Sequence, residues 1–394
     1  MDMPVEKTVA FELNGNQVEA LNGETILEAA ERIGFEIPRL CYKKGLRADG
    51  NCRACVVEID GERTLAPSCC RYPTEGMKVR SNSERARHSQ KIVLEMLLGD
   101  MPGQKSSPYT LNSELDYWSE KLEVAASRFP ERIQDSPDES HPAISVQLDA
   151  CIQCTRCVRA CREEQVNDVI GYAWRGSHSA IVFDLDDPMG SSSCVGCGEC
   201  VQACPTGALM PSGGIGLVTS DSEVPSVCPY CGVGCLLTYH VKERKLLRVE
   251  GRQGPANQSR LCVKGRYGFD YVHHPARLTR PLIRKEGVPK IAELLDPENW
   301  RDVFREADWD EALDLAGSGL REIRQKHGGH ALAAYGCAKG SNEEAYLLQK
   351  LVRTGFGSNN IDHCTRLCHA SSVSALLEGI GSGAVSNPFT DVTD

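Results

Sequence analysis

Cysteine carries the clearest chemical signal in this 394-residue chain, which holds twenty of them. Sixteen fall into four groups of four, and only Cys70, Cys337, Cys364 and Cys368 lie outside the groups. Short and regular spacings of this kind are typical of thiolates that bind metal. Disulfides are a poor alternative, because the first residues show no secretion signal and cytoplasmic thiols are kept reduced. We therefore predict four metal-binding centres in a cytoplasmic protein.

The first group lies in the stretch CYKKGLRADGNCRACVVEIDGERTLAPSCC. It consists of Cys41, Cys52, Cys55 and Cys69. A loop-borne trio with a later fourth cysteine resembles the plant-type ferredoxins, which implies a 2Fe-2S cluster. A zinc site is the alternative, since four-cysteine zinc sites also use a Cys-x-x-Cys pair. Cys70 competes for the fourth position, and we choose Cys69 because the stretch that follows it resembles the family spacing.

The second and third groups repeat one spacing, C-x2-C-x2-C-x3-C, in CIQCTRCVRAC and CVGCGECVQACP. Their members are Cys151, Cys154, Cys157 and Cys161, then Cys194, Cys197, Cys200 and Cys204. In bacterial-type two-cluster ferredoxins the fourth cysteine of each run binds the other cluster. We therefore expect two 4Fe-4S clusters, with Cys204 completing the site of the first run and Cys161 that of the second. Each last cysteine is also expected to start a helix that crosses to its neighbour.

The fourth group is more widely spread. It consists of Cys228, Cys231 and Cys235 in CPYCGVGC, with Cys262 following in RLCVKGRYG. Between them LLTYHVKER and KLLRVEG alternate in the manner of strands, which indicates a small sheet. Judged on the cysteines alone, a zinc ribbon is the alternative to a further 4Fe-4S cluster.

The elements that must position these groups can also be predicted. KTVAFELNGNQVEA indicates two strands joined by a turn at Asn14-Gly15. Far along the chain, a linker rich in Gly, Ser and Pro precedes the fourth group. Thr25 and Glu28 form a capping-box pattern before an apolar helical face.

Beyond residue 300 the pattern predicts the opening of an α/β layer. A helix is expected to start at Trp309-Asp310, a short buried strand to follow in ALAAYG, and a second helix to start at a Ser341 cap.

The segment HCTRLCHASS combines cysteine and histidine in a different way. Cys364 and Cys368 are one helical turn apart, and His369 follows directly. Taken alone, such cysteines are more often buried helix thiols than ligands, and a lone histidine is more often structural.

The wider sequence context favours chemistry for part of this segment. CVKGRYGFDYVHHPARLTRPLIR resembles the N-terminal domain of molybdenum- or tungsten-dependent bis-pterin oxidoreductases. YGCAKGSNEEAYLLQKLVRTGFGSNNIDHCTRLCHASSV resembles the formate dehydrogenases of that family. The resemblance implies that Cys368 binds the metal, that His369 acts near the substrate proton and that Lys264 lies between a 4Fe-4S cluster and one pterin. It gives no such role to Cys337, Cys364, His363 or Cys70, which we expect to be structural.

The first 210 residues are similar to the large electron-transfer subunit of respiratory complex I and to NAD-reducing hydrogenases. The combination resembles the alpha subunit of soluble NAD-dependent formate dehydrogenases. This implies reversible oxidation of formate to CO2 at a molybdenum or tungsten bis-molybdopterin guanine dinucleotide. Electrons would pass through one 2Fe-2S and three 4Fe-4S clusters to a separate flavin-containing, NAD-binding subunit.

The chain departs from these families in two respects. Residues 71–150 hold no cysteine, so the His-and-Cys cluster of the complex I pattern is not expected. The family's catalytic subunit continues for several hundred residues beyond the last residue here, so we expect a truncated chain. An electron-relay protein with an inert remnant of the molybdopterin domain is therefore the alternative function.

Together these patterns predict an α+β multidomain chain. Its expected parts are a β-grasp 2Fe-2S ferredoxin-like domain (1–82), a helical spacer (83–140), a bacterial-type dicluster 4Fe-4S ferredoxin (141–215), a small β-rich 4Fe-4S domain (221–281) and the start of an α/β molybdopterin oxidoreductase domain (282–394).

Composition narrows the classes further. At 41% hydrophobic and 25% charged residues the chain is typical of globular proteins. No run of eighteen apolar residues occurs, so no membrane span is expected. A formal charge of −10 argues against nucleic-acid binding.

Overall fold

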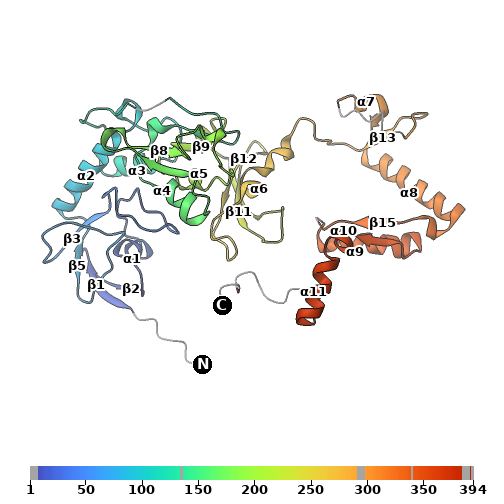
Figure 1. The fold of residues 1–394 in the computed structure, drawn as a ribbon, viewed down its shortest axis with the longest axis horizontal. Coiled ribbons are helices and arrows are strands. Elements are labelled where there is room, and N and C mark those ends of the chain that lie inside the picture. Colours follow the sequence, from blue (N-terminus) through green and yellow to red (C-terminus); the bar gives the residue numbers. More distant parts are fainter. Residues whose placement is uncertain (1–7, 134–135, 291–297, 339, 384–390, 392–394) are drawn as a thin grey trace. The chain divides into compact units, whose positions relative to one another are not determined.

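The computed structural model describes residues 8–133, 136–290, 298–338, 340–383 and 391. The chain divides into two compact units, Met1–Asp270 and Tyr271–Asp394 (Figure 1). Both mix helices and strands, and the predicted α+β multidomain class is confirmed. Among the residues that the structure describes, no helix combines the length and apolar content needed to cross a bilayer.

The first unit opens with a five-stranded sheet in the order β2-β1-β5-β3-β4. Its strands are β1 (Val9–Leu13), β2 (Asn16–Ala20), β3 (Val56–Ile59), β4 (Ala66–Pro67) and β5 (Lys78–Arg80). The predicted hairpin is confirmed: β1 and β2 are antiparallel, and the turn residues Asn14 and Gly15 have φ of 50° and 84°. Positive φ at both positions is what a two-residue hairpin turn requires.

Helix α1 (Ile26–Arg32) packs against this sheet. The predicted capping box is confirmed, since the Thr25 hydroxyl accepts from the Glu28 N–H while the Glu28 carboxylate accepts from the Thr25 N–H. Its apolar face lies in one core with strands β1, β2, β3 and β5. This core holds the loop from which the first cysteine group emerges.

The spacer contributes two helices, α2 (Glu84–Leu98) and α3 (Glu114–Lys121). The buried amide of Gln90 on α2 donates to the Val56 carbonyl at 2.9 Å, which joins the helix to the sheet. Leu94, Leu115 and Trp118 lie in a second core that also contains Cys41 and Cys154. The spacer thus packs against both the first and the second cysteine group.

The dicluster region is built from two small two-stranded antiparallel sheets and two short helices. β6 (Ile144–Val146) pairs with β9 (Leu209–Pro211), and β7 (Ile170–Ala173) pairs with β8 (Ala180–Phe183). The helices are α4 (Arg156–Arg159), which continues as a π-helical turn over Ala160–Glu164, and α5 (Glu199–Ala203).

The expectation that each last cysteine starts a helix is wrong. Both helices begin one residue before the third cysteine of their run, and the fourth cysteine lies at or beyond the α-helical end. The reason is the residue that precedes each helix. Thr155 and Gly198 adopt left-handed φ values of 59° and 73°, so the chain turns sharply and the helix starts there.

A three-stranded antiparallel sheet follows, in the order β10-β11-β12. Strands β11 (Leu236–Lys242) and β12 (Lys245–Gly251) confirm the prediction, and α6 (Val263–Tyr267) begins directly after Cys262. Strand β10 (Ser222–Val227) lies in what the sequence indicated to be a linker. Proline is tolerated there because β10 is an edge strand, so Pro225 needs no N–H toward a second neighbour.

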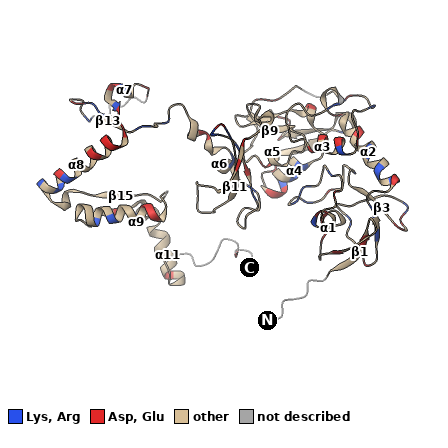
Figure 2. Cartoon of the chain, turned by 180° about the vertical axis from the view of Figure 1, so that it is seen from behind, with Lys and Arg blue, Asp and Glu red and all other residues tan. Residues whose placement is uncertain are grey.

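The second unit begins with β13 (Leu282–Arg284), which pairs with β14 (Phe304–Glu306), and α7 (Trp300–Val303). Helix α8 (Trp309–His327) starts where predicted, but its cap is Asp308, whose carboxylate accepts from the Glu311 N–H at 2.8 Å. Acidic residues occupy its first turn and basic residues its last (Figure 2), which complements the helix dipole.

A parallel strand pair completes the second unit. β15 (Ala334–Gly336) and β16 (Ile361–His363) are joined by α9 (Asn342–Lys350), which continues as a π-helical turn over Leu351–Phe356. The predicted Ser341 cap of α9 is confirmed, with Glu344 as its capping-box partner. Strand β15 was expected to be buried, but it is half-exposed, and Tyr335 is exposed. Helices α10 (Cys364–Cys368) and α11 (Ala370–Ile380) follow.

Candidate metal centres

The structure brings the first four cysteines together. Cys41, Cys55 and Cys69 are buried, Cys52 is half-buried and Cys70 is exposed. The Cys41 N–H donates to the Cys52 sulfur at 3.4 Å. Hydrogen bonds from the thiols of Cys52 and Cys69 lower the pKa of Cys41 to about 2, and one from Cys69 lowers that of Cys55 to about 7.

These contacts fit a cluster held by four thiolates. The four sulfurs lie close enough together to share protons. A bound metal would replace these protons and bind all four groups as thiolates. The Cys70 sulfur lies 3.5 Å from the Cys69 sulfur, but Cys70 is exposed whereas Cys69 is buried. The geometry therefore favours Cys69, as chosen from the sequence.

The two repeated runs exchange their fourth cysteines in the structure. Burial and the neighbouring thiolates of Cys154, Cys151 and Cys204 raise the pKa of Cys157. One small pocket is lined by all four of these cysteines and otherwise mainly by apolar side chains such as Leu148. Such a lining fits a 4Fe-4S cluster, whose corners are bound by thiolate and whose faces need only apolar contact.

The second run shows the complementary grouping. Burial raises the pKa of Cys200, as do the nearby thiolates of Cys197, Cys194 and Cys161. Cys161 thus lies with the second run and Cys204 with the first, as the ferredoxin pattern implies.

Backbone geometry repeats between the two runs as well. The Gly196 N–H donates to the Cys194 sulfur at 3.3 Å. Burial raises the pKa of Cys151 to about 12, and a backbone hydrogen bond from Gln153 offsets part of that rise. Backbone N–H groups aimed at sulfur stabilise the thiolate and tune the potential of a bound cluster.

The fourth group surrounds the end of the β10-β11-β12 sheet. The Cys228 N–H donates to the Cys235 carbonyl at 2.9 Å, and the pKa of Cys235 is raised by burial and by the nearby Cys228, Cys231 and Cys262 thiolates. Cys231 and Cys262 are exposed.

Lys264 lies on helix α6, two residues after Cys262, and its side chain is exposed. It belongs to the first unit, whereas Cys368 and His369 belong to the second. Within the second unit, Cys368 is the last residue of α10 and His369 links α10 to α11. Both side chains are exposed.

The neighbours of Cys368 have local partners. The His363 ring nitrogen Nδ1 accepts from the Thr365 N–H at 3.2 Å and so caps α10. The Cys364 sulfur accepts from the Ala338 N–H at 3.1 Å, which ties α10 to the loop after β15. Cys337 is exposed in the same loop.

Three buried arginines were missed from the sequence. Arg156, Arg159 and Arg266 are 4% exposed or less, and each makes hydrogen bonds close to a cysteine group. A signal was available, since Arg156 and Arg159 lie inside a cysteine run whose residues must be buried around a cluster.

Four family models match the chain in order. They are a 2Fe-2S iron-sulfur cluster binding domain (6–84), a 4Fe-4S dicluster domain (150–208), a molybdopterin oxidoreductase Fe4S4 domain (221–274) and a molybdopterin oxidoreductase domain (277–394).

Curated relatives match nearly the whole chain. A Staphylococcus haemolyticus protein provisionally named formate dehydrogenase is 30% identical over 96% of this chain and 41% of its own length. A Bacillus subtilis protein, YjgC, provisionally named an oxidoreductase, is 32% identical over 99% of this chain and 42% of its own length. The chain thus spans about two fifths of the length of the curated relatives it matches.

Among solved structures, a chain of an NAD+-reducing [NiFe]-hydrogenase in the H2-reduced state is 29% identical, with a TM-score of 0.48 over 52% of this chain and 87% of its own. The four matches give the chain its domain order: a 2Fe-2S domain, a 4Fe-4S dicluster domain, a molybdopterin oxidoreductase Fe4S4 domain and a match to the molybdopterin oxidoreductase domain.

Proposed function

We propose that this chain is the N-terminal part of the alpha subunit of an NAD-dependent formate dehydrogenase. The observation that carries the proposal is the order of the thiol groups: three ferredoxin-type groups and a fourth lie within one compact unit, directly before a molybdopterin oxidoreductase domain. Relatives provisionally named formate dehydrogenase support the choice of substrate. Formate would be oxidised reversibly to CO2.

The proposed ligands follow the four groups. The 2Fe-2S cluster would be held by Cys41, Cys52, Cys55 and Cys69, and the three 4Fe-4S clusters by Cys151, Cys154, Cys157 and Cys204, by Cys161, Cys194, Cys197 and Cys200, and by Cys228, Cys231, Cys235 and Cys262.

A molybdenum or tungsten pterin centre would supply the two-electron chemistry. Cys368 would offer it a soft thiolate ligand. His369 would receive or steer the proton that formate releases. Lys264 would place a positive charge between the fourth cluster and the pterin.

Electrons would then leave singly through the clusters to a separate flavin-containing, NAD-binding subunit. The cytoplasm suits this assignment, since cluster thiols must stay reduced before iron is inserted.

An electron relay is the second candidate. The observation that favours it is that all four cysteine groups lie within the first unit, so a relay needs no metal at Cys368.

Metal analysis of the anaerobically purified chain tests both candidates. About fourteen irons per chain with molybdenum or tungsten near one would support a catalytic head. The same iron with neither heavy metal would favour the relay, and zinc in place of iron would exclude both.

Substrate and site are tested with formate as the only reductant and cluster reduction followed by EPR. Formate dehydrogenase predicts reduction by the metal-loaded chain that is lost in Cys368→Ser and kept in the matched Cys337→Ser variant. Equal reduction in both variants would remove Cys368 from the site.

A further inference from the structure

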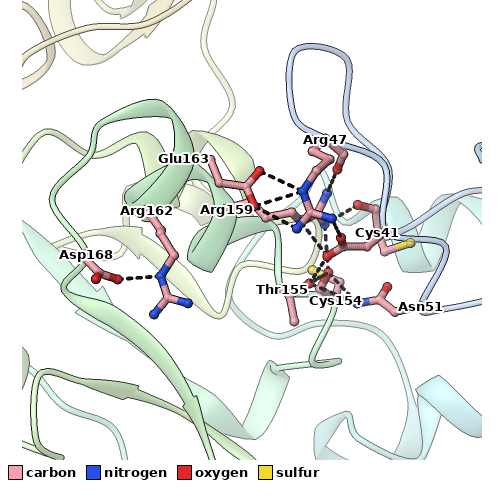
Figure 3. A network of polar contacts seen from close by, with 10 residues as sticks. Cys41, Arg47, Asn51, Cys154, Thr155, Arg159, Arg162, Glu163 and Asp168 are labelled. Carbon is pink, nitrogen blue, oxygen red and sulfur yellow. Dashed lines mark hydrogen bonds and ion pairs between the residues drawn. The ribbon is translucent and has the colours of Figure 1, made fainter.

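The side chain of Arg159 joins two cysteine groups. It is 2% exposed, and its Nη2 donates to the Cys41 carbonyl at 2.6 Å and to the Cys154 carbonyl at 3.1 Å (Figure 3). Cys41 belongs to the first group and Cys154 to the second. One nitrogen atom therefore connects the backbones of two loops that lie more than a hundred residues apart in sequence.

The surrounding contacts dock the same two loops. Asp49 lies 3.1 Å from Arg159 Nε and accepts from the Thr155 hydroxyl at 3.2 Å. The Asn51 amide donates to the Thr155 hydroxyl at 3.0 Å, and Arg47 forms an ion pair with Glu163 at 2.8 Å. Figure 3 shows Arg159 at the centre of this network, with the ferredoxin loop on one side and the start of α4 on the other.

Arginine is the residue type that such a place demands. Its guanidinium keeps its charge when buried, and its planar fork can reach several carbonyls at fixed angles, whereas lysine offers a single flexible point charge. Arg162, three residues further on, provides the contrast. It is exposed and pairs with Asp168, apart from both loops (Figure 3).

We propose that Arg159 is a positioning residue for electron transfer between the cluster bound by Cys41 and the cluster bound by Cys154. By holding both loops it fixes the separation of the two clusters. Its positive charge also stabilises the reduced, more negative state of each. The step is one electron: the donor cluster is oxidised by one, the acceptor is reduced by one, and no bond or proton moves.

The other end of the dicluster region has a related contact. Arg266 Nε donates to the Cys197 carbonyl at 2.8 Å, and its Nη2 pairs with Glu199 at 2.5 Å. Glu199 in turn accepts from the Leu261 N–H at 2.9 Å, next to Cys262. A buried arginine on a cluster-cysteine carbonyl thus occurs at both junctions of the dicluster region.

The test compares Arg159→Met with the matched Arg162→Met, each in the full chain with clusters loaded anaerobically. Three quantities are measured: iron content, the reduction potentials of the clusters, and the enhancement of 2Fe-2S spin relaxation when the neighbouring 4Fe-4S cluster is also reduced. Arg159→Met should keep its iron, shift both potentials to more negative values and lose most of the relaxation enhancement. Arg162→Met should match the wild type in all three.

A purely structural role would lower stability without changing the magnetic coupling or the potentials, so wild-type values in Arg159→Met overturn the proposal. If that variant fails to load iron, Arg159→Lys and Asn51→Ala decide. Arg159→Lys keeps the charge and loses the fork, so wild-type potentials with reduced enhancement are expected, and Asn51→Ala should also weaken the enhancement. Unchanged enhancement in both overturns the proposal.

The inference rests on the proposed cluster assignments, and the two can fail separately. Absence of 2Fe-2S and 4Fe-4S signals in the wild type contradicts the assignments. Normal wild-type signals that show no magnetic interaction contradict the role of Arg159 alone.

Discussion

Cys161 offers the sharpest test of how the dicluster region is organised. It closes the first cysteine run in sequence, but the structure groups it with Cys194, Cys197 and Cys200. We therefore expect Cys161→Ser to damage the second 4Fe-4S site and to leave the first intact. A run that bound its own cluster would give the opposite result.

The size of the effect follows from cluster stoichiometry. Loss of one 4Fe-4S cluster removes about four of about fourteen irons. Retention as a three-iron cluster would remove about one. Cys161 is buried, so water could take the place of its lost thiolate as a cluster ligand only if the site opened.

The assay is iron analysis together with EPR of the reduced chain. The spectrum of Cys161→Ser should match that of Cys197→Ser and differ from that of Cys154→Ser. The 2Fe-2S relaxation enhancement separates the two sites, since the Cys154 carbonyl accepts from Asn51 of the ferredoxin loop and from Arg159, which also holds Cys41. A Cys161→Ser spectrum that matches Cys154→Ser instead would refute the exchanged grouping.

Three further changes have defined outcomes. Arg156→Met removes an ion pair (2.6 Å) between the buried Arg156 and the partly exposed Glu114, and should lower the stability of the first unit by about 1–3 kcal/mol in urea unfolding, because charge-assisted hydrogen bonds are lost; an unchanged midpoint would contradict this. The His240 ring, 3.4 Å from Glu250, is the largest cause that lowers the pKa of that carboxyl to about 2, so the stabilisation is present above the ordinary value of 4.5 and is lost as the pH falls toward 2. Glu250→Gln should therefore lower the melting temperature at pH 6, by an amount that corresponds to less than about 1 kcal/mol of unfolding free energy. The difference between the variant and the wild type should disappear in acid. Gly198→Ala should cost about four irons, because its φ is 73° and a Cβ there would lie 2.1 Å from a buried arginine side chain; full iron content would show that the loop relaxes.

Local signals predicted the fold where neighbouring residues decide the structure. The Asn14-Gly15 turn and the Thr25–Glu28 box work through contacts within four residues, so the sequence alone suffices. The Ser341 cap succeeded for the same reason. At α8 the pattern placed the helix start correctly but missed the cap by a residue, since an aspartate is a better acceptor than the tryptophan that follows it.

Elements that depend on distant partners were harder to predict. Strand β10 has mainly exposed side chains, so its sequence lacks the alternation of a half-buried strand, and only pairing with β11 makes it a strand. β15 was expected to be buried from its apolar letters, but among the described residues few side chains cover Tyr335. The hydrophobic pattern of a sequence indicates which side chains could be buried, but tertiary packing decides which of them are buried.

The cysteine groups themselves could be predicted because metal binding imposes short spacings on the sequence. The burial of Arg159 could be inferred from its place inside a cysteine run, but its contacts could not, since no spacing rule relates Arg159 to Cys41. Their partners are backbone carbonyls, which every residue possesses, so nothing in the sequence marks the acceptor.

The internal repeat nevertheless shows how the two halves acquire different neighbours. Arg156 and Glu199 occupy the same place, immediately before the third cysteine of each run, and both are buried. They carry opposite charges and pair outside the repeat, Arg156 with Glu114 of the spacer and Glu199 with Arg266 of α6. Exchanging the neighbours would bring two carboxylates or two guanidinium groups together in a buried site, which costs several kcal/mol. The charge reversal at this position therefore favours packing of the first run against the spacer and of the second run against the Fe4S4 domain.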